Sequence, residues 1–295
     1  MPKPQIALLT HSGSPQLTRD DRHLAEAIER SAGVTAMPWD AADALDQIAG
    51  SDAVVIRSTW NYTEVLPAFL DFVDAVGRTG TPMFNGAPVV HWNCDKHYLG
   101  ELECEGVAVL PTIFAPQADH VLLSELVAGR SWSDLVIKPT VSATARGLFR
   151  IRASEIADRQ EQFAAALAEQ DLMIQPLAPE VASDGEWSLM FFGGRYSHAV
   201  RKRAARGDIR VQSDFGGRSQ AEAAPAALIA DAERLLEHVH QRFPDAAPLL
   251  YARVDGIERD GRLMLMELEL IEPELFFRRD GEAASRCAAA LLEQL

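Results

Sequence analysis

The sequence predicts an α/β region followed by an α+β region in a chain of 295 residues. Two observations lead to this fold class. The first ninety residues alternate short apolar runs with amphipathic segments, which is typical of a parallel sheet covered by helices on both faces. From about residue 135 onward, strand-like runs follow one another directly, which is typical of antiparallel pairs. A chain of this length is expected to form two or three domains, and we predict boundaries near residues 90 and 175.

In the first region, apolar periodicity predicts each element and glycines mark where helices end. Runs that are apolar throughout predict buried strands, and apolar residues three or four positions apart predict helices. Gly33 and Gly50 stand where two of these helices should stop. The turn at 10–14 lacks the GxGxxG pattern, so we expect no dinucleotide site there. The predicted strands are 5–10, 34–38 and 52–58, and the predicted helices are 20–31, 41–49 and 64–76.

The rest of the chain begins after a break rich in turn residues at 81–88. Gly106 ends the helix that follows this break, and the later strands are expected to pair with their neighbours along the chain. The predicted helices are 95–105, 154–169, 221–241 and 281–295. The predicted strands are 134–138, 148–152, 172–175, 186–192, 195–202, 209–213, 249–255 and 262–270.

Composition and charge exclude several classes of protein. The chain has 28 Lys and Arg against 43 Asp and Glu, a net charge of −15, so we expect it to bind neither nucleic acid nor an anionic membrane. With 47% hydrophobic and 24% charged residues, it has the composition of a soluble globular protein. No apolar run reaches the roughly 18 residues of a membrane-spanning helix. Three cysteines without CxxC spacing indicate neither a disulfide framework nor a zinc site, so we expect a cytoplasmic protein.

The strand predicted at 262–270 ends in alternating carboxylates. Glu267 and Glu269 share one face about 7 Å apart, so they repel each other unless a cation lies between them. If this strand pairs with the preceding one, Asp255 lies close to both carboxylates. Three oxygen donors of this kind suit Mg²⁺, and the alternative is an edge strand with solvated acids. The opposite face is expected to carry Met264, Met266, Leu268 and Leu270.

Another predicted strand ends in a lysine that precedes a loop of small residues. Lys138 closes the apolar run at 134–138, and Pro139 and the loop 140–147 follow it. The hydroxyls of this loop, including that of Ser142, and its backbone N–H groups are able to fold over an anion beside the ammonium group. The sequence therefore predicts a phosphate site here, with a strand that simply ends in lysine as the alternative.

Four short motifs resemble those of the ATP-grasp enzymes in their order and approximate spacing. They are 93–99 (NCDKHYL), 136–139 (VIKP), 173–177 (MIQPL) and 266–269 (MELE), and the resemblance covers roughly residues 85–275. Three more segments resemble the glutathione-synthetase-like branch, which includes small ligases such as the D-cycloserine-forming cyclo-ligase. These segments are 85–86 (NG), 197–202 (SHAVRK) and 272–276 (EPELF).

The resemblance implies the ATP-grasp fold, in which two subdomains hold a nucleotide between them. Residues 1–90 would form an N-terminal α/β domain on the substrate side. Residues 91–175 would form the central subdomain with the phosphate-covering loop, and residues 176–295 the C-terminal subdomain with the Mg²⁺-binding strands. The family commonly has Asn where Glu269 stands and more glycine in the loop 140–147, so this chain departs from the pattern at both places.

The resemblance also implies roles for individual residues around ATP and Mg²⁺. Lys96 and Lys138 would contact the phosphates under a loop that includes Ser142. Gln175 and the backbone through Leu177 would face the adenine. Glu186 would lie near the ribose or the metal. The ligands of Mg²⁺ would be Asp255, Glu267 and Glu269.

The implied reaction activates a carboxylate by transferring the γ-phosphoryl group of ATP to it, and an amine or related nucleophile then attacks the acyl phosphate. Arginine suits the binding of an acid and of the developing phosphate through paired N–H donors. We assign this catalytic role to Arg201, Lys202 and Arg210 as a hypothesis.

Substrate contacts are predicted directly after the strand 52–58, at the edge where α/β sheets tend to bind ligands. The candidates there are Arg57, Ser58, Asn61 and Tyr62, and the alternative is a loop whose Trp60 and Tyr62 pack against the next helix. Glu272 either receives a substrate ammonium group or is simply solvated.

The predicted function is that of an ADP-forming, Mg²⁺-dependent ligase that joins a small, amino-acid-like carboxylate to a nucleophile. One alternative is intramolecular ring closure of the D-cycloserine-forming type, and another is a nucleotide-binding regulatory protein without turnover. The partners are small molecules, and the sequence leaves the oligomeric state open, with a homodimer as one form.

Overall fold

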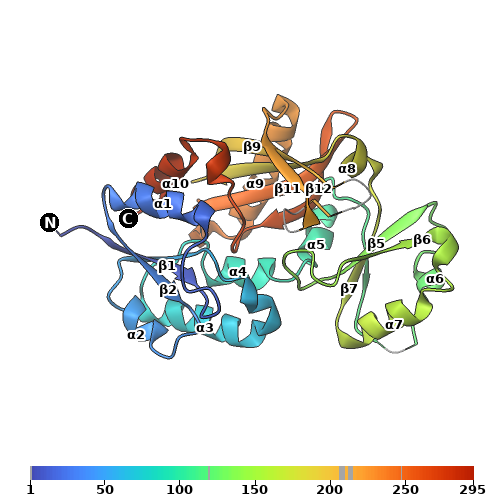
Figure 1. The fold of residues 1–295 in the computed structure, drawn as a ribbon, viewed down its shortest axis with the longest axis horizontal. Coiled ribbons are helices and arrows are strands. Elements are labelled where there is room, and N and C mark those ends of the chain that lie inside the picture. Colours follow the sequence, from blue (N-terminus) through green and yellow to red (C-terminus); the bar gives the residue numbers. More distant parts are fainter. Residues whose placement is uncertain (1, 119, 206–209, 212–214, 247) are drawn as a thin grey trace.

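A computed structural model describes residues 2–118, 120–205, 210–211, 215–246 and 248–295. Three sheets form its frame, one parallel and two antiparallel, and helices cover them (Figure 1). This arrangement confirms the predicted order of an α/β region before an α+β region. The predicted strand at 209–213 falls mostly outside the described residues. The predicted domain boundaries near 90 and 175 stay a prediction.

The first sheet is parallel, with strand order β2-β1-β3. Its strands are β1 (Gln5–Thr10), β2 (Gly33–Pro38) and β3 (Ala53–Ile56), and its helices are α1 (Arg19–Glu29), α2 (Ala44–Ile48) and α3 (Leu66–Thr79). Successive residues of β1 enter different cores, because side chains alternate along a strand. Ile6 and Leu8 share a core with α1 and with the last helix, α10 (Ala283–Leu292), whereas Ala7 and Leu9 share a core with α2 and α3.

The second sheet is antiparallel, with strand order β4-β7-β5-β6. Its strands are β4 (Ile113–Ala115), β5 (Asp134–Pro139), β6 (Phe149–Arg152) and β7 (Leu172–Pro176). Two helices, α6 (Leu123–Leu126) and α7 (Gln160–Glu169), share its apolar core. The pairing of β5 with β6 confirms the predicted strand pair, whereas β4 and α6 were not predicted.

The third sheet is antiparallel, with strand order β10-β9-β8-β11-β12, and the long helix α9 (Ala226–Arg242) covers one of its faces. Part of the other face packs against α10 and α1, so the C-terminal helix lies beside the first helix of the chain (Figure 1). The strands are β8 (Glu186–Phe192), β9 (Arg195–Arg203), β10 (Arg218–Ala221), β11 (Tyr251–Arg259) and β12 (Arg262–Glu269).

Short helices connect these layers. They are α4 (Ala87–Asn93), α5 (Tyr98–Cys104) and α8 (Pro179–Ser183), together with 3-10 turns at Trp60–Glu64, Ala153–Glu155, Pro244–Ala246 and Phe277–Arg279. The sequence predicted a break where α4 begins, but Pro88 sits in the first turn of a helix, where its missing N–H costs nothing. In the part of the chain that the structure describes, no helix combines the length and the apolarity that crossing a membrane requires.

A β-bulge in the hairpin of β11 and β12 corrects the predicted faces of β12. The pairing passes from Asp255 opposite Glu267 to Gly256 opposite Leu265, so Met266 is an extra residue on its strand. The bulge reverses the alternation at Met266. The α9 side carries Leu263, Leu265, Leu268 and Leu270, whereas Met264 and Met266 lie on the other side with Glu267 and Glu269. The prediction that both methionines share a face with Leu268 and Leu270 is therefore wrong.

The bulge requires glycine at position 256. A Cβ atom on Gly256 would lie 2.4 Å from the carbonyl oxygen of Met264, which no real Cβ atom does. We expect Gly256→Ala to lower the free energy of unfolding by about 1–3 kcal/mol, since the strands must shift to make room. Urea denaturation measures this loss. The control is Gly281→Ala, which should lose little stability because a Cβ atom there would meet no atom within 4 Å. A loss at position 256 as small as that of the control would contradict the close approach of the two strands at the bulge.

Candidate active site

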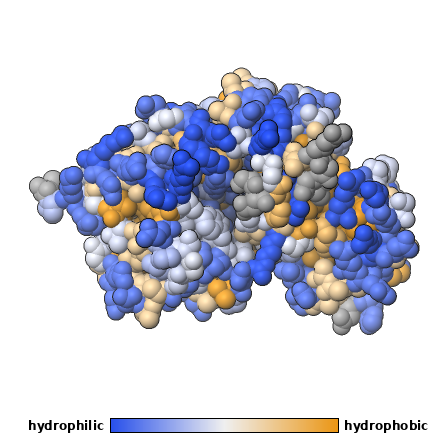
Figure 2. All heavy atoms as spheres, in the orientation of Figure 1, coloured by the Kyte–Doolittle hydropathy of each residue, from blue (hydrophilic) through white to orange (hydrophobic). Residues whose placement is uncertain are grey.

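A cavity of about 880 Å³ lies between the second and third sheets and extends to the end of the first. This volume is typical of sites that bind small molecules and cofactors. Figure 2 shows the same face of the molecule as Figure 1, hollowed between its two halves with hydrophilic residues around the opening. Residues from β5, β7, β8, β9, β11 and β12 line the cavity, together with the segments that follow β3 and β12.

Two lysines flank one carboxylate in this cavity. Nζ of Lys96 lies 3.3 Å and Nζ of Lys138 lies 3.6 Å from the carboxylate oxygens of Glu267. Nζ of Lys96 also donates to the backbone oxygen of Ser142, at 2.7 Å. Burial opposes the charged form of Glu267, but the two lysines outweigh it and lower its pKa to about 2. Two ammonium groups therefore lie in the cavity beside the loop 140–147.

Backbone contacts explain why Lys96 reaches the end of β12. The amide of Asn93 donates to the carbonyl of Leu268 and accepts from the N–H of Leu270. The hydroxyl of Tyr98 donates to the same carbonyl of Leu268 and accepts from its N–H. Because side chains on both sides of Lys96 bind this strand end, the turn between α4 and α5 holds the lysine beside Glu267.

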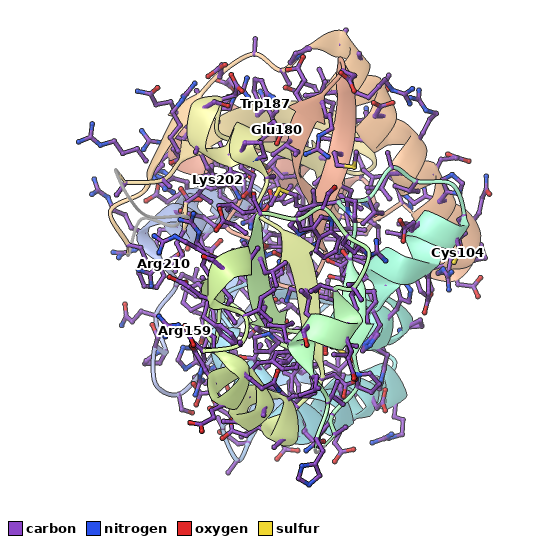
Figure 3. The ribbon with its side chains drawn as sticks, turned by 90° about the vertical axis from the view of Figure 1, so that its right-hand side faces the viewer. Cys104, Arg159, Glu180, Trp187, Lys202 and Arg210 are labelled. Carbon is purple, nitrogen blue, oxygen red and sulfur yellow. The ribbon has the colours of Figure 1, made fainter. Side chains whose placement is uncertain are left out.

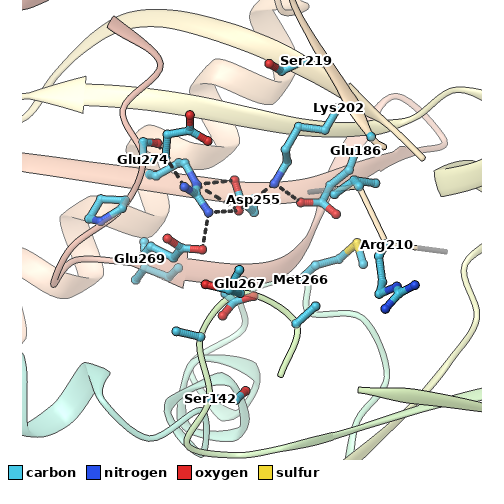
Figure 4. Close-up of a pocket in the computed structure, with 18 of the residues that line it drawn as sticks. Ser142, Glu186, Lys202, Arg210, Ser219, Asp255, Met266, Glu267, Glu269 and Glu274 are labelled. Carbon is cyan, nitrogen blue, oxygen red and sulfur yellow. Dashed lines mark hydrogen bonds and ion pairs between the residues drawn. The ribbon is translucent and has the colours of Figure 1, made fainter. Parts of the chain in front are cut away.

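Asp255 is the most strongly paired carboxylate of the cavity. It accepts hydrogen bonds from Lys202 at 3.0 Å, from Arg253 at 2.9 Å and from the hydroxyl of Ser188. Burial opposes its charge, but Arg253 and Lys202 outweigh burial and lower its pKa to about 2. Lys202 also pairs with Glu186, and Figure 4 shows Asp255 between these two side chains and the pair Glu267 and Glu269.

Glu269 is less completely neutralised than Asp255. It pairs with Arg253, but burial and the nearby carboxylates of Asp255 and Glu267 raise its pKa to about 7. Sequence analysis gave Arg253 no role. The alternation Arg253-x-Asp255 was the signal that could have assigned one.

The carboxylates of the cavity suit a Mg²⁺ ion only if other ligands complete its coordination shell. Among the described residues, no three His, Cys, Asp or Glu side chains converge into a ready-made metal cage. Their donors are all oxygens, which Mg²⁺ prefers, and the incomplete neutralisation of Glu269 favours a cation beside it. The residues therefore fit a metal ion that also binds phosphate oxygens and water. The assignment of Asp255, Glu267 and Glu269 as ligands stays a prediction.

The other end of the cavity is apolar. Leu110, Ala178, Val181, Val211 and Ile257 form a cluster there, against which Met264 and Met266 pack. Gln175 and Leu177 line the same end, and the amide of Gln175 donates to the hydroxyl of Thr112 at 2.9 Å. A flat aromatic ring suits such walls. The geometry is compatible with the predicted adenine contacts of Gln175 and Leu177.

The loop 140–147 forms part of the cavity wall, and Ser142 lines the cavity as predicted. Thr144 and Ala145 adopt left-handed φ angles of 54° and 55°, a strained conformation for residues other than glycine. Arg146 pairs with Glu64 at the solvent-exposed surface. This ion pair joins the glycine-poor loop to the 3-10 turn that follows β3.

Two of the three proposed catalytic cations face the cavity, and one does not. Lys202 and Arg210 line it, whereas Arg201 lies on the opposite face of β9. The guanidinium of Arg201 stacks 3.7 Å from the ring centre of Trp187, on the side covered by α9. In Figure 3, Lys202 and Arg210 lie toward the second sheet and Trp187 farther from it. The catalytic assignment of Arg201 is corrected, because neighbours on a strand point to opposite faces.

The residues predicted to bind substrate after β3 also divide into two groups. Arg57 and Tyr62 line the cavity, whereas Ser58 and Asn61 do not. The hydroxyl of Ser58 donates to the carboxylate of Asp21. The side-chain amide of Asn61 accepts a hydrogen bond from the indole N–H of Trp39 and donates one to the carboxylate of Asp40. Both side chains support the loop, which corrects their assignment as substrate contacts. Tyr62 also packs on Phe69 of α3, as the alternative interpretation expected.

Arg57 forms a buried ion pair that sequence reasoning missed. Its guanidinium donates to Asp21 at 2.8 Å and 3.0 Å and to the carbonyl of Pro273 at 2.7 Å. Its side chain is only 1% exposed. Asp21 belongs to α1, so this contact joins the first helix to the segment after β12. No local pattern predicts it, because 36 and 216 residues separate the partners.

Comparisons with known proteins agree with this architecture. The family model described as the N-terminal domain of D-cycloserine synthetase DcsG matches residues 6–85. The cycloserine biosynthesis protein DcsG of Streptomyces lavendulae is 33% identical over an alignment of 299 positions, which covers 98% of this chain and 98% of that protein.

Solved structures give the same result. The crystal structure of D-cycloserine synthetase DcsG superposes with a TM-score of 0.88 at 30% identity, over 98% of this chain and 99% of that one. D-alanine–D-alanine ligase from Bacillus anthracis superposes with a TM-score of 0.67 at 16% identity, over 98% of this chain and 96% of that one. At that identity the second likeness concerns the fold alone.

Proposed function

The chain belongs to the D-cycloserine synthetase family of ATP-grasp ligases, and from this premise we propose that it activates a small, amino-acid-like carboxylate as an acyl phosphate. Membership in this family identifies the chain as an ATP-dependent ligase, so the alternative of a regulatory protein without turnover is not retained. The observation that supports the acyl phosphate is the placement of Lys96 and Lys138 on the two sides of Glu267. Two ammonium groups at one end of a cavity suit a triphosphate whose γ-group is transferred.

The residues of the cavity support each part of this reaction. The apolar end would hold the adenine near Gln175 and Leu177, and the two lysines would hold the phosphates. Mg²⁺ held near Glu267 and Glu269 would supply positive charge that neutralises the phosphoryl oxygens. A substrate carboxylate oxygen then bonds to the γ-phosphorus, and ADP leaves with the electron pair of the broken bond. Lys202 of β9 and Arg210, which lies between β9 and β10 in the sequence, line the cavity and would neutralise the phosphate that is transferred.

The likeness to D-cycloserine synthetase favours ring closure within one molecule. The D-cycloserine ring contains a bond between a carboxyl carbon and a side-chain nitrogen of the same amino acid. A ligase that forms it needs no second acceptor site. We therefore propose a substrate that carries both its carboxylate and its nitrogen nucleophile. We further propose a cytoplasmic location and the division into domains 1–90, 91–175 and 176–295.

Phosphate release tests the proposal. The protein is incubated with ATP, Mg²⁺ and a panel of amino acids that includes O-amino-D-serine, the ring-opened form of D-cycloserine, with its nitrogen free or acylated. We expect ADP and phosphate in equal amounts with at least one amino acid, and a hydroxamate when hydroxylamine traps the acyl phosphate. EDTA should stop the reaction and excess Mg²⁺ restore it. Tight ATP binding without turnover on any amino acid would contradict the proposal.

A further inference from the structure

The segment that follows β12 is held by side chains along its whole length. Its backbone carbonyls at 270, 271, 273, 274 and 275 accept hydrogen bonds from Asn85, Tyr251, Arg57, Arg253 and His198 in turn. Asp20 then accepts from the N–H groups of residues 277 and 278. Side chains of the third sheet and of the segments that follow β3 and α3 therefore fix one short stretch of backbone, which lies at the wall of the cavity.

Glu272 sits in the middle of this fixed segment and lines the cavity. Its neighbours Glu267, Glu269 and Asp255 each pair with a lysine or an arginine. Glu272 has no such partner, since no hydrogen bond or ion pair joins its carboxyl group to another described residue. Glu272 is half-buried, and a carboxyl group that a rigid segment keeps unpaired at the wall of a cavity is available to a molecule bound there.

The charges around Glu272 set its affinity for a proton. Burial raises its pKa to about 8, Glu269 adds to this effect, and the cations oppose it without cancelling it. A carboxyl group tuned toward the working pH is suited to exchange protons during a reaction. The groups that face it are Glu269 of β12, Arg253 and Tyr251 of β11, Lys96 before α5, Arg57 after β3 and Tyr62 of the following turn.

We propose that Glu272 is the general base that accepts the proton released by the attacking nitrogen, an inference that rests on the proposed ligase function. The nitrogen lone pair forms the new C–N bond at the acyl carbon. The bond from that carbon to the phosphate oxygen breaks, and inorganic phosphate leaves with its electron pair. The proton lost from nitrogen passes to the carboxylate of Glu272 and from there to solvent when the product leaves.

The tethered backbone matters to this role because a base must lie within hydrogen-bond reach of the nitrogen. Arg57 and Arg253 donate hydrogen bonds to the backbone carbonyls of Pro273 and Glu274, the two residues that follow Glu272 in the sequence. Their guanidinium groups thereby hold in place the backbone that carries the carboxyl group. This gives Arg57 a positioning role in place of the substrate contact that its sequence context predicted.

Glu272→Gln and Glu272→Asp test the proposal with two readouts. Positional isotope exchange in ¹⁸O-labelled ATP reports reversible formation of the acyl phosphate, and product formation reports the attack by nitrogen. O-amino-D-serine and the other active amino acids of the panel serve as probes. We expect Glu272→Gln to keep exchange within about threefold of wild type while product formation falls by about 10²–10⁴-fold, the usual contribution of a general base. Glu272→Asp should recover part of the rate.

A pH profile separates a base from a structural residue. In wild type, kcat/KM should rise as the pH passes through the pKa of Glu272, because only the ionised form accepts a proton. This rise should be absent in Glu272→Gln. Glu293→Gln is the matched control, since Glu293 lies on the surface in an ion pair with Arg195.

Three results would overturn the proposal, and each has a distinct meaning. Product formation by Glu272→Gln at the wild-type rate shows that another group accepts the proton. A loss of exchange and product together, with a raised KM, shows that Glu272 holds a substrate ammonium group instead. If wild type gives neither exchange nor phosphate release with any amino acid, the proposed function itself fails. A thermal melt of each variant shows whether a loss reflects unfolding.

Discussion

Glu267→Gln is expected to reduce kcat by about a thousandfold or more while the protein stays folded. The carboxylate of Glu267 lies between Nζ of Lys96 and Nζ of Lys138, at 3.3 Å and 3.6 Å. Glutamine keeps the shape but removes the charge that would bind Mg²⁺ and orient both lysines. Preorganised charges of this kind supply several kcal/mol of transition-state stabilisation in phosphoryl transfer. Single-turnover measurement of ADP formation under saturating ATP tests the expectation.

The control for this variant is Glu258→Gln. Glu258 belongs to β11, the strand that pairs with β12, but it does not line the cavity. We expect it to keep the wild-type rate. If Glu267→Gln retains more than a tenth of that rate, neither the metal role of Glu267 nor its role between the lysines holds.

The sequence predicted the strands of the cavity well, because they are long and strongly periodic. Glu186–Phe192 begins and ends where the apolar run predicts, and the β11–β12 pair forms in the order expected. The faces were harder to predict. A bulge shifts every later side chain by one residue, and only the pairing partner shows that Met266 is the extra one. Local periodicity alone therefore cannot assign Met264 and Met266 to a face.

The candidate site shows the same division between local and distant information. Alternation along β9 implied that Arg201 and Lys202 point to opposite faces, but not which face is covered by α9 and which by the cavity. The polar cluster after β3 stood at the expected edge of the sheet. Whether Ser58 and Asn61 point to a substrate or to Asp21 and Trp39 depends on where α1 and the next strand lie. Those positions come from packing, which no local motif describes.

The pair of Asp21 and Arg57 is expected to be the largest single contribution to stability among the ion pairs of the cavity wall. Both side chains are buried, with exposed fractions of 6% and 1%. The Nη1 group of Arg57 already lacks a partner, so the guanidinium depends on Asp21 and on the carbonyl of Pro273. Asp21→Asn leaves a buried cation without its counter-charge, and we expect a loss of about 3–5 kcal/mol in the free energy of unfolding. Urea denaturation measures this loss.

A double-mutant cycle separates the pair itself from the burial of its charges. Removing both charges in Asp21→Asn/Arg57→Met should recover most of the lost stability, because breaking a buried pair costs more than replacing it. Glu293→Gln should cost less than about 1 kcal/mol, since its pair with Arg195 is exposed to solvent. Activity should not recover with stability in the double variant, because the carbonyl of Pro273 has lost the donor that holds Glu272 in place. Equal recovery of stability and rate would mean that Arg57 supports the fold without positioning the base.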